Sequence, residues 1–165
     1  MSRVTLYKEI KKAISSIKEV KYVGLFNSQY TQSGKHDHTN YPAVYIQFNF
    51  SDYANEAGMG IQRYNCTVTT HLVFESYKID AIEVLEMNEK IYLEMQQLST
   101  PPDEKTAFGK LLRNGERMSA DHDVLQIHET DYSTLIRDSI ADIRIRKTLS
   151  LTTTITPTVV DEITI

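Results

Sequence analysis

Residues 41–50 read Tyr41-Pro42-Ala43-Val44-Tyr45-Ile46-Gln47-Phe48-Asn49-Phe50, and together with the chain up to Leu98 they decide the fold. Every second side chain after Ala43 is apolar, which puts one group on a single face: Val44, Ile46, Phe48 and Phe50. Residues Tyr64 to Glu75 alternate in the same way, with one face formed by Tyr64, Cys66, Val68, Thr70, Leu72 and Phe74. Alternation over this length predicts two strands, each with one buried and one solvated face.

Helical spacing of apolar residues occurs on both sides of these strands. Near the start, the spacing predicts a helix Thr5–Lys18, with Ser2 or Thr5 as the N-cap and an apolar stripe of Leu6, Ile10, Ala13, Ile14 and Ile17. A second helix is predicted over Asp80–Leu98, with a stripe of Val84, Met87, Ile91, Met95 and Leu98. Pro101 and Pro102 end this helix, because proline cannot continue it.

The remaining patterns predict shorter strands and loops. Tyr22–Asn27 reads as a short strand and Ser28–Asn40 as a long polar loop. Later strand candidates are Leu111-Leu112, Val124–Thr130 and Ile140–Leu151, and Asn114-Gly115 reads as a turn. The expected fold class is α+β, a mainly antiparallel β-sheet with two helices packed on one face. Its predicted core is Val44, Ile46, Phe48, Val68, Leu72, Phe74, Leu85, Ile91 and Met95.

Length and composition favour one domain followed by an arm. A chain of 165 residues has the size of one domain, which we place at residues 1–150. Residues 151–165 form a threonine-rich C-terminal arm, and the longer stretch Thr148–Ile165 holds seven threonines. A threonine-rich sequence of this kind favours an extended backbone. We therefore expect the arm either to pair with a neighbour's sheet edge or to stay disordered.

Charge, cysteine content and hydropathy exclude several classes of protein. The net charge of −4 argues against a nucleic-acid binder, which usually carries a basic stripe. Cys66 is the only cysteine, so no intrachain disulfide forms, and it lies on the apolar face of its strand. We expect no signal peptide, and no stretch approaches the roughly 20 apolar residues that cross a bilayer.

The histidines are the starting point for any catalytic hypothesis. His36 and His38 lie two residues apart in a polar loop, and His122 and His128 could supply further metal ligands. We expect His36 and His38 to be solvated, because the loop does not force them to converge. His71 lies on the polar face of its strand, where it more often contacts a neighbour than acts as a base.

No other enzyme motif is present. The acidic side chains of the second helix follow its solvent side: Glu83, Glu86, Glu89 and Glu94. Gly58-Met59-Gly60 lacks the spacing of a phosphate-binding loop. We therefore assign no catalytic, cofactor-binding or metal-binding residue and expect no cofactor and no enzyme activity. The alternatives are a small metal-dependent hydrolase that uses the histidines at positions 36, 38, 122 and 128, or a cytosolic protein-binding adaptor.

The order of the patterns resembles one known family. A short N-terminal helix and a polar loop precede the Tyr-Pro strand Tyr41–Ile46. A long alternating strand, Asn65–Phe74, follows, and then Tyr77-Lys78-Ile79-Asp80-Ala81 opens a helix before the late strands. This order is similar to that of the tail-terminator and tail-completion proteins of long-tailed bacteriophages and prophages. The resemblance covers about Ser2 to Leu149 and rests on the order of elements, because these families have no invariant catalytic motif.

The resemblance implies a virion structural protein that is assembled in the bacterial host cytoplasm. Such a protein forms a ring, commonly a hexamer, that caps the tail tube and docks the head. The implied partners are further copies of the chain, the tail tube protein and a head-completion or connector protein. DNA passes through the lumen without specific binding, which suits an acidic chain because phosphate contacts dominate nonspecific affinity. No membrane partner is implied.

Overall fold

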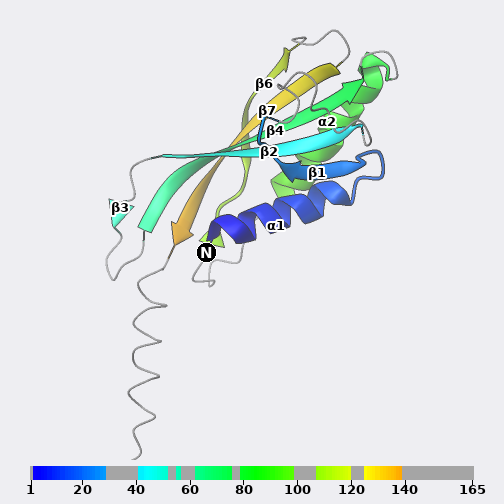
Figure 1. The fold of residues 1–165 in the computed structure, drawn as a ribbon. Coiled ribbons are helices and arrows are strands. Elements are labelled where there is room, and N and C mark those ends of the chain that lie inside the picture. Colours follow the sequence, from blue (N-terminus) through cyan, green and yellow to red (C-terminus); the bar gives the residue numbers. More distant parts are fainter. Residues whose placement is uncertain are drawn as a thin grey trace, which may run out of the picture.

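The computed structural model describes residues 2–28, 41–51, 55–56, 62–75, 79–98, 107–119 and 125–138. Two helices and a mixed sheet form the described part of the chain (Figure 1). The elements are α1 (Ser2–Ser15), β1 (Tyr22–Leu25), β2 (Ala43–Phe50), β3 (Asn55–Glu56), β4 (Gln62–Glu75), α2 (Ala81–Gln97), β5 (Ala107–Phe108), β6 (Leu112–Ser119) and β7 (Leu125–Asp138). The predicted α+β class is confirmed.

The sheet is built around its two longest strands. The order is β1-β2-β4-β7-β5, with β3 paired to β4 and β6 paired to β7. Strands β4 and β7 pair antiparallel along their whole length, from Gln62 opposite Asp138 to Glu75 opposite Leu125. Only the β1–β2 pair is parallel among the described strands, so the sheet is mainly antiparallel as predicted.

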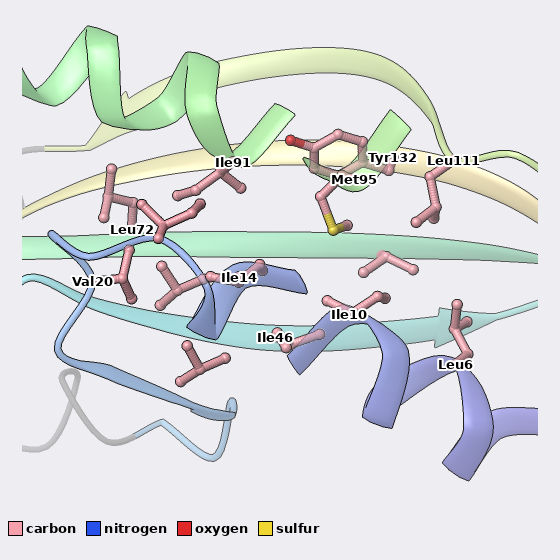
Figure 2. Packing of buried hydrophobic residues seen from close by; sticks show 14 of the residues in the cluster. Leu6, Ile10, Ile14, Val20, Ile46, Leu72, Ile91, Met95, Leu111 and Tyr132 are labelled. Carbon is pink, nitrogen blue, oxygen red and sulfur yellow. The ribbon is translucent and has the colours of Figure 1, made fainter. Parts of the chain in front are cut away.

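Both helices pack on the same face of the sheet and enclose one core (Figure 2). From the helices, this core takes Leu6, Ile10, Ile14, Val84, Met87, Ile91 and Met95. From the sheet, it takes Val44, Ile46, Val68, Leu72, Phe74, Tyr132 and Ile136 among others. Helix α2 lies within one residue of its predicted bounds at each end, whereas α1 ends at Ser15 and not at the predicted Lys18. Most of each predicted stripe is buried, but Ala13 and Leu98 are only partly buried.

Two members of the predicted core behave differently from the rest. Phe48 is only partly buried, at the margin of the core. Leu85 is wrong as a core residue, because 52% of it is exposed. Val84, one position earlier, is 1% exposed and directs its side chain at the sheet. A helix turns by about 100° per residue, so Leu85 falls on the far side of α2.

The first turn of α1 begins earlier than predicted. The helix starts at Ser2, so neither Ser2 nor Thr5 is an N-cap and that prediction is wrong. Arg3 lies in this first turn, and its guanidinium carbon lies 4.1 Å from the centre of the Phe50 ring. Its Nε also donates to the Tyr64 hydroxyl at 3.3 Å. These contacts fix the first turn against the ends of β2 and β4.

The late strands also differ from the sequence prediction. Strand β7 does not end at Thr130 but continues to Asp138. Asn114-Gly115 is not a turn, because it lies within β6, where the register against β7 shifts between Arg113 and Gly115. This shift is a β-bulge, which inserts one extra residue opposite the partner strand. The predicted loop beyond Ser28, the predicted strand Ile140–Leu151 and the C-terminal arm lie outside the described residues.

Among the described helices, none has the length and apolar character that a membrane span requires.

Candidate functional site

The helix-free face, the side of the sheet opposite α1 and α2, is buried at the end where β2 and β7 begin and β4 ends, and among the described residues it is more exposed toward the other end. Its buried part holds an apolar cluster of Ala43, Tyr45, Val73, Leu125 and Ile127, with Phe26 and Tyr41 packed against it. The prediction that this side of Tyr64–Glu75 is solvated is therefore wrong in its second half. Thr69 is 9% exposed and His71 only 3%, because aromatic side chains pack over this end of the sheet.

His71 lies at the centre of a polar network on this face. Its Nδ1 is 3.1 Å from Oε1 of Glu129 on β7, and its Nε2 is 3.0 Å from Oε1 of Gln47 on β2. The Phe26 ring stacks on the imidazole with a centroid distance of 4.6 Å and an interplanar angle of 19°. The imidazole is thus held from both edges and from one flat side.

The surroundings of His71 favour its neutral form. Burial lowers the pKa of His71, and the Glu129 carboxylate opposes this effect only in part. In the neutral ring, Nδ1–H donates to Glu129, and Nε2 then needs a donor. Gln47 supplies that donor when its amide is turned to present the NH₂ group, because the oxygen and nitrogen of an amide are assigned from their hydrogen bonds.

Arg117 neutralises the acidic side of the network. It forms ion pairs with Glu129 and, over 2.8 Å, with Asp131, and the hydrogen bond to Asp131 raises the pKa of Arg117. Thr69 donates its hydroxyl to the other Asp131 oxygen at 2.6 Å. The network therefore joins four adjacent strands, β2, β4, β7 and β6, on one face of the sheet.

The chemistry of this network is that of a structural cluster. A general base needs a ring nitrogen within reach of the proton that it removes. Here Glu129 and Gln47 occupy the two nitrogens of His71, and Phe26 covers the ring. The expectation that His71 contacts a neighbour agrees with this geometry.

A second polar cluster lies on the opposite face, between α2 and the sheet. Asn88, 3% exposed, accepts a hydrogen bond from the Thr130 hydroxyl at 3.1 Å and donates to Glu116 at 3.4 Å. Glu116 also pairs with Arg113, whose guanidinium carbon lies 3.9 Å from the centre of the Tyr92 ring. This cluster fastens α2 to β7 and to β6.

His128 and Tyr132 lie on this face and are also buried, at 4% and 0% exposed. Burial lowers the pKa of His128 and raises that of Tyr132, so both side chains are neutral at neutral pH. Within the described residues, the His128 Nδ1 has no hydrogen-bond partner. Both groups are desolvated by packing, which explains the direction of each shift.

The structure separates the histidines that it describes. Leu72 pairs with His128, so His128 and His71 lie on opposite faces of the sheet. His36, His38 and His122 lie outside the described residues. In the part of the chain that the structure describes, no three metal-ligating side chains come together. Cys66 lies in the core as predicted, and burial raises the pKa of its thiol to about 12.

The open part of the helix-free face carries two opposed arginines that sequence reasoning missed. Arg63 of β4 lies directly opposite Arg137 of β7. Leu135, which is 48% exposed, lies two residues before Arg137 and thus on the same face. The sequence pattern that could have placed Arg137 in a strand is the alternation from Tyr132 to Ile136, which continues β7 beyond its predicted end.

A scan against models of protein families gives no match to this chain, and a search of curated proteins also gives none.

Proposed function

We propose that this chain is a virion structural protein of a long-tailed phage or prophage. It caps the tail tube and joins the tube to the head as a ring-forming tail terminator or neck component. The fold is the observation that supports this proposal most. Helix α1 precedes the Tyr-Pro strand β2, which pairs antiparallel with the long strand β4, and α2 and the late strands follow. This order agrees with the family resemblance of the sequence.

The buried polar groups support a scaffold rather than a reactive pocket. The network around His71 joins four strands, and the cluster around Asn88 joins a helix to two strands. Each of these clusters is explained by the fold alone, without a substrate. A protein of this kind acts through its surfaces, so we assign no catalytic residue.

The partners of such a protein are other proteins of the virion. We propose contacts with further copies of the chain, with the tail tube protein and with a head-completion or connector protein. DNA passes through the ring, and the net charge of −4 limits its adhesion. The protein is assembled in the host cytoplasm and ends in the virion.

Disrupting the coding sequence in the phage or prophage tests this proposal. We expect infected cells to accumulate filled heads without tails and free tails of abnormal length, visible by negative-stain electron microscopy. Supplying the intact protein from a plasmid should restore joined particles. Normal virions in the absence of the protein would contradict the proposal, whatever the oligomeric state of the purified chain.

A further inference from the structure

The first of two complementary surfaces is the arginine face, formed by Arg63, Arg137, Leu112 and Leu135 on the helix-free face of the sheet. Leu112 of β6 pairs with Ser133, two residues before Leu135, so both leucines share this face. They are 58% and 48% exposed. The arginine face thus combines two cations with exposed apolar area.

The two arginines lack the neutralisation that other charges of the sheet receive. Like charges directly opposite each other on antiparallel strands are destabilising. Arg117 is paired with two carboxylates, whereas neither Arg63 nor Arg137 has an ion pair among the described residues. The Nε of Arg137 is buried and has no hydrogen-bond partner there. Two such cations side by side would be stabilised by carboxylates from outside the subunit.

The second surface is the α2 stripe, formed by Ile82, Leu85, Glu86, Glu89 and Leu93. These residues recur at spacings of three and four and face away from the sheet, opposite the buried stripe of α2. Ile82, Leu85 and Leu93 are 63%, 52% and 56% exposed. The α2 stripe thus combines two carboxylates with three large apolar side chains.

The two surfaces complement each other in charge and in apolar character, and they lie on opposite sides of the subunit. We propose that the arginine face of one copy binds the α2 stripe of a second copy of this chain. Because the contact joins two different patches, each bound pair leaves one patch of each kind free. Repetition of the contact produces a ring when the rotation closes. This inference rests on the proposed function and names the surfaces that would form its ring.

Charge reversal tests this contact. The sheet variant carries Arg63→Glu and Arg137→Glu, and the helix variant carries Glu86→Arg and Glu89→Arg. We expect each variant alone to weaken self-association of the full chain at least about 10-fold, measured by light scattering over a concentration series. A matched control on α1, Lys8→Glu with Lys12→Glu, should associate like the wild type. Circular dichroism verifies that each variant folds.

Mixing the two variants separates this contact from any other effect of charge. Each variant repels its own copies, but its two surfaces match those of the other variant. An equimolar mixture should therefore regain association, as should one chain that carries all four substitutions.

Three outcomes overturn the inference: a wild-type chain that stays monomeric at high concentration, variants that associate normally, or a mixture that gains nothing. Loss of oligonucleotide binding in the sheet variant without a loss of association would assign the arginines to nucleic acid instead. The phage disruption experiment does not depend on any of these results, so the two proposals can fail separately.

Discussion

Thr130 donates its hydroxyl to Oδ1 of Asn88 over 3.1 Å, and this buried bond joins α2 to the central strand β7. Both residues are almost fully desolvated, at 0% and 3% exposed. A buried hydrogen bond contributes only about 0.5–1.5 kcal/mol net, but leaving one partner unpaired costs about 1–3 kcal/mol. The position of the helix on the sheet therefore depends on a polar contact as well as on apolar packing.

Substitution of this pair should reveal the coupling. We expect Asn88→Ala to lower the free energy of unfolding by about 1–3 kcal/mol, because Thr130 and Glu116 lose a partner. Thr130→Val should also destabilise, and the double variant should lose less than the sum of the two. Urea denaturation of the four proteins measures this. Strictly additive losses would show that the two side chains do not interact.

Comparing substitutions at Leu72 and Leu85 tests which side chains of β4 and α2 face the core. Leu72 is 1% exposed in the core and Leu85 is 52% exposed on α2. We expect Leu72→Ala to lower the free energy of unfolding by about 2–5 kcal/mol and Leu85→Ala by no more than about 0.5 kcal/mol. Equal losses in chemical denaturation would show that the faces are wrongly assigned.

His71 should make stability depend on pH. Its pKa is lowered in the folded protein, so the unfolded chain binds more protons as the pH falls below the ordinary histidine value of about 6.5. The stability contributed by neutral His71 is complete above that value and is lost as the pH falls toward the folded pKa. Burial lowers the pKa of His128 as well, so His128 also contributes stability that is lost as the pH falls.

The His71→Gln variant isolates the part of the pH dependence of stability that comes from His71. We expect it to be less stable than the wild type at neutral pH, with a difference that shrinks as the pH falls below about 6.5. Urea denaturation at several pH values measures the difference, and His128→Gln serves as the comparison. A difference that grows on acidification would mean that His71 is charged in the folded protein.

The C-terminal arm gives a prediction from the sequence, because it lies outside the described residues. Its threonines favour extended structure, but the arm has no amphipathic face to bury by itself. We expect deletion of residues 152–165 to leave the domain folded and to weaken ring formation or tail joining. Light scattering and a complementation assay measure the two effects. Normal completion of tails by the truncated chain would remove the arm from assembly.

Periodicity predicted the parts of the fold that have a simple apolar pattern. Strands β2 and β4 and helix α2 bury most of the side chains that their spacing indicates, with Phe48, Phe50 and Leu98 only partly buried. The second half of β7 was missed because a polar residue on its core face, Thr134, and an apolar residue on its open face, Leu135, interrupt the alternation. Thr134 is accommodated in the core by a specific contact, because its hydroxyl donates to the Gly109 carbonyl at 2.8 Å. Such contacts between distant segments leave no periodic signal.

The features of the candidate site also depend on contacts between distant segments, which the sequence pattern does not reveal. Asn114-Gly115 has the composition of a tight turn, but pairing with β7 accommodates it as a bulge. The burial of His71 depends on Phe26, which lies far from it in sequence. The opposition of Arg63 and Arg137 depends on the register of β4 and β7, which the sequence pattern alone does not determine. Tertiary pairing therefore supplies both polar clusters and the arginine face.

Location in the particle is the most direct test of the proposed role. An antibody raised against the purified chain and coupled to gold can be applied to purified virions and to free tails. The proposal predicts label at the junction of head and tail, and at one end of free tails. Label elsewhere on the particle, or particles that never contain the protein, would contradict it.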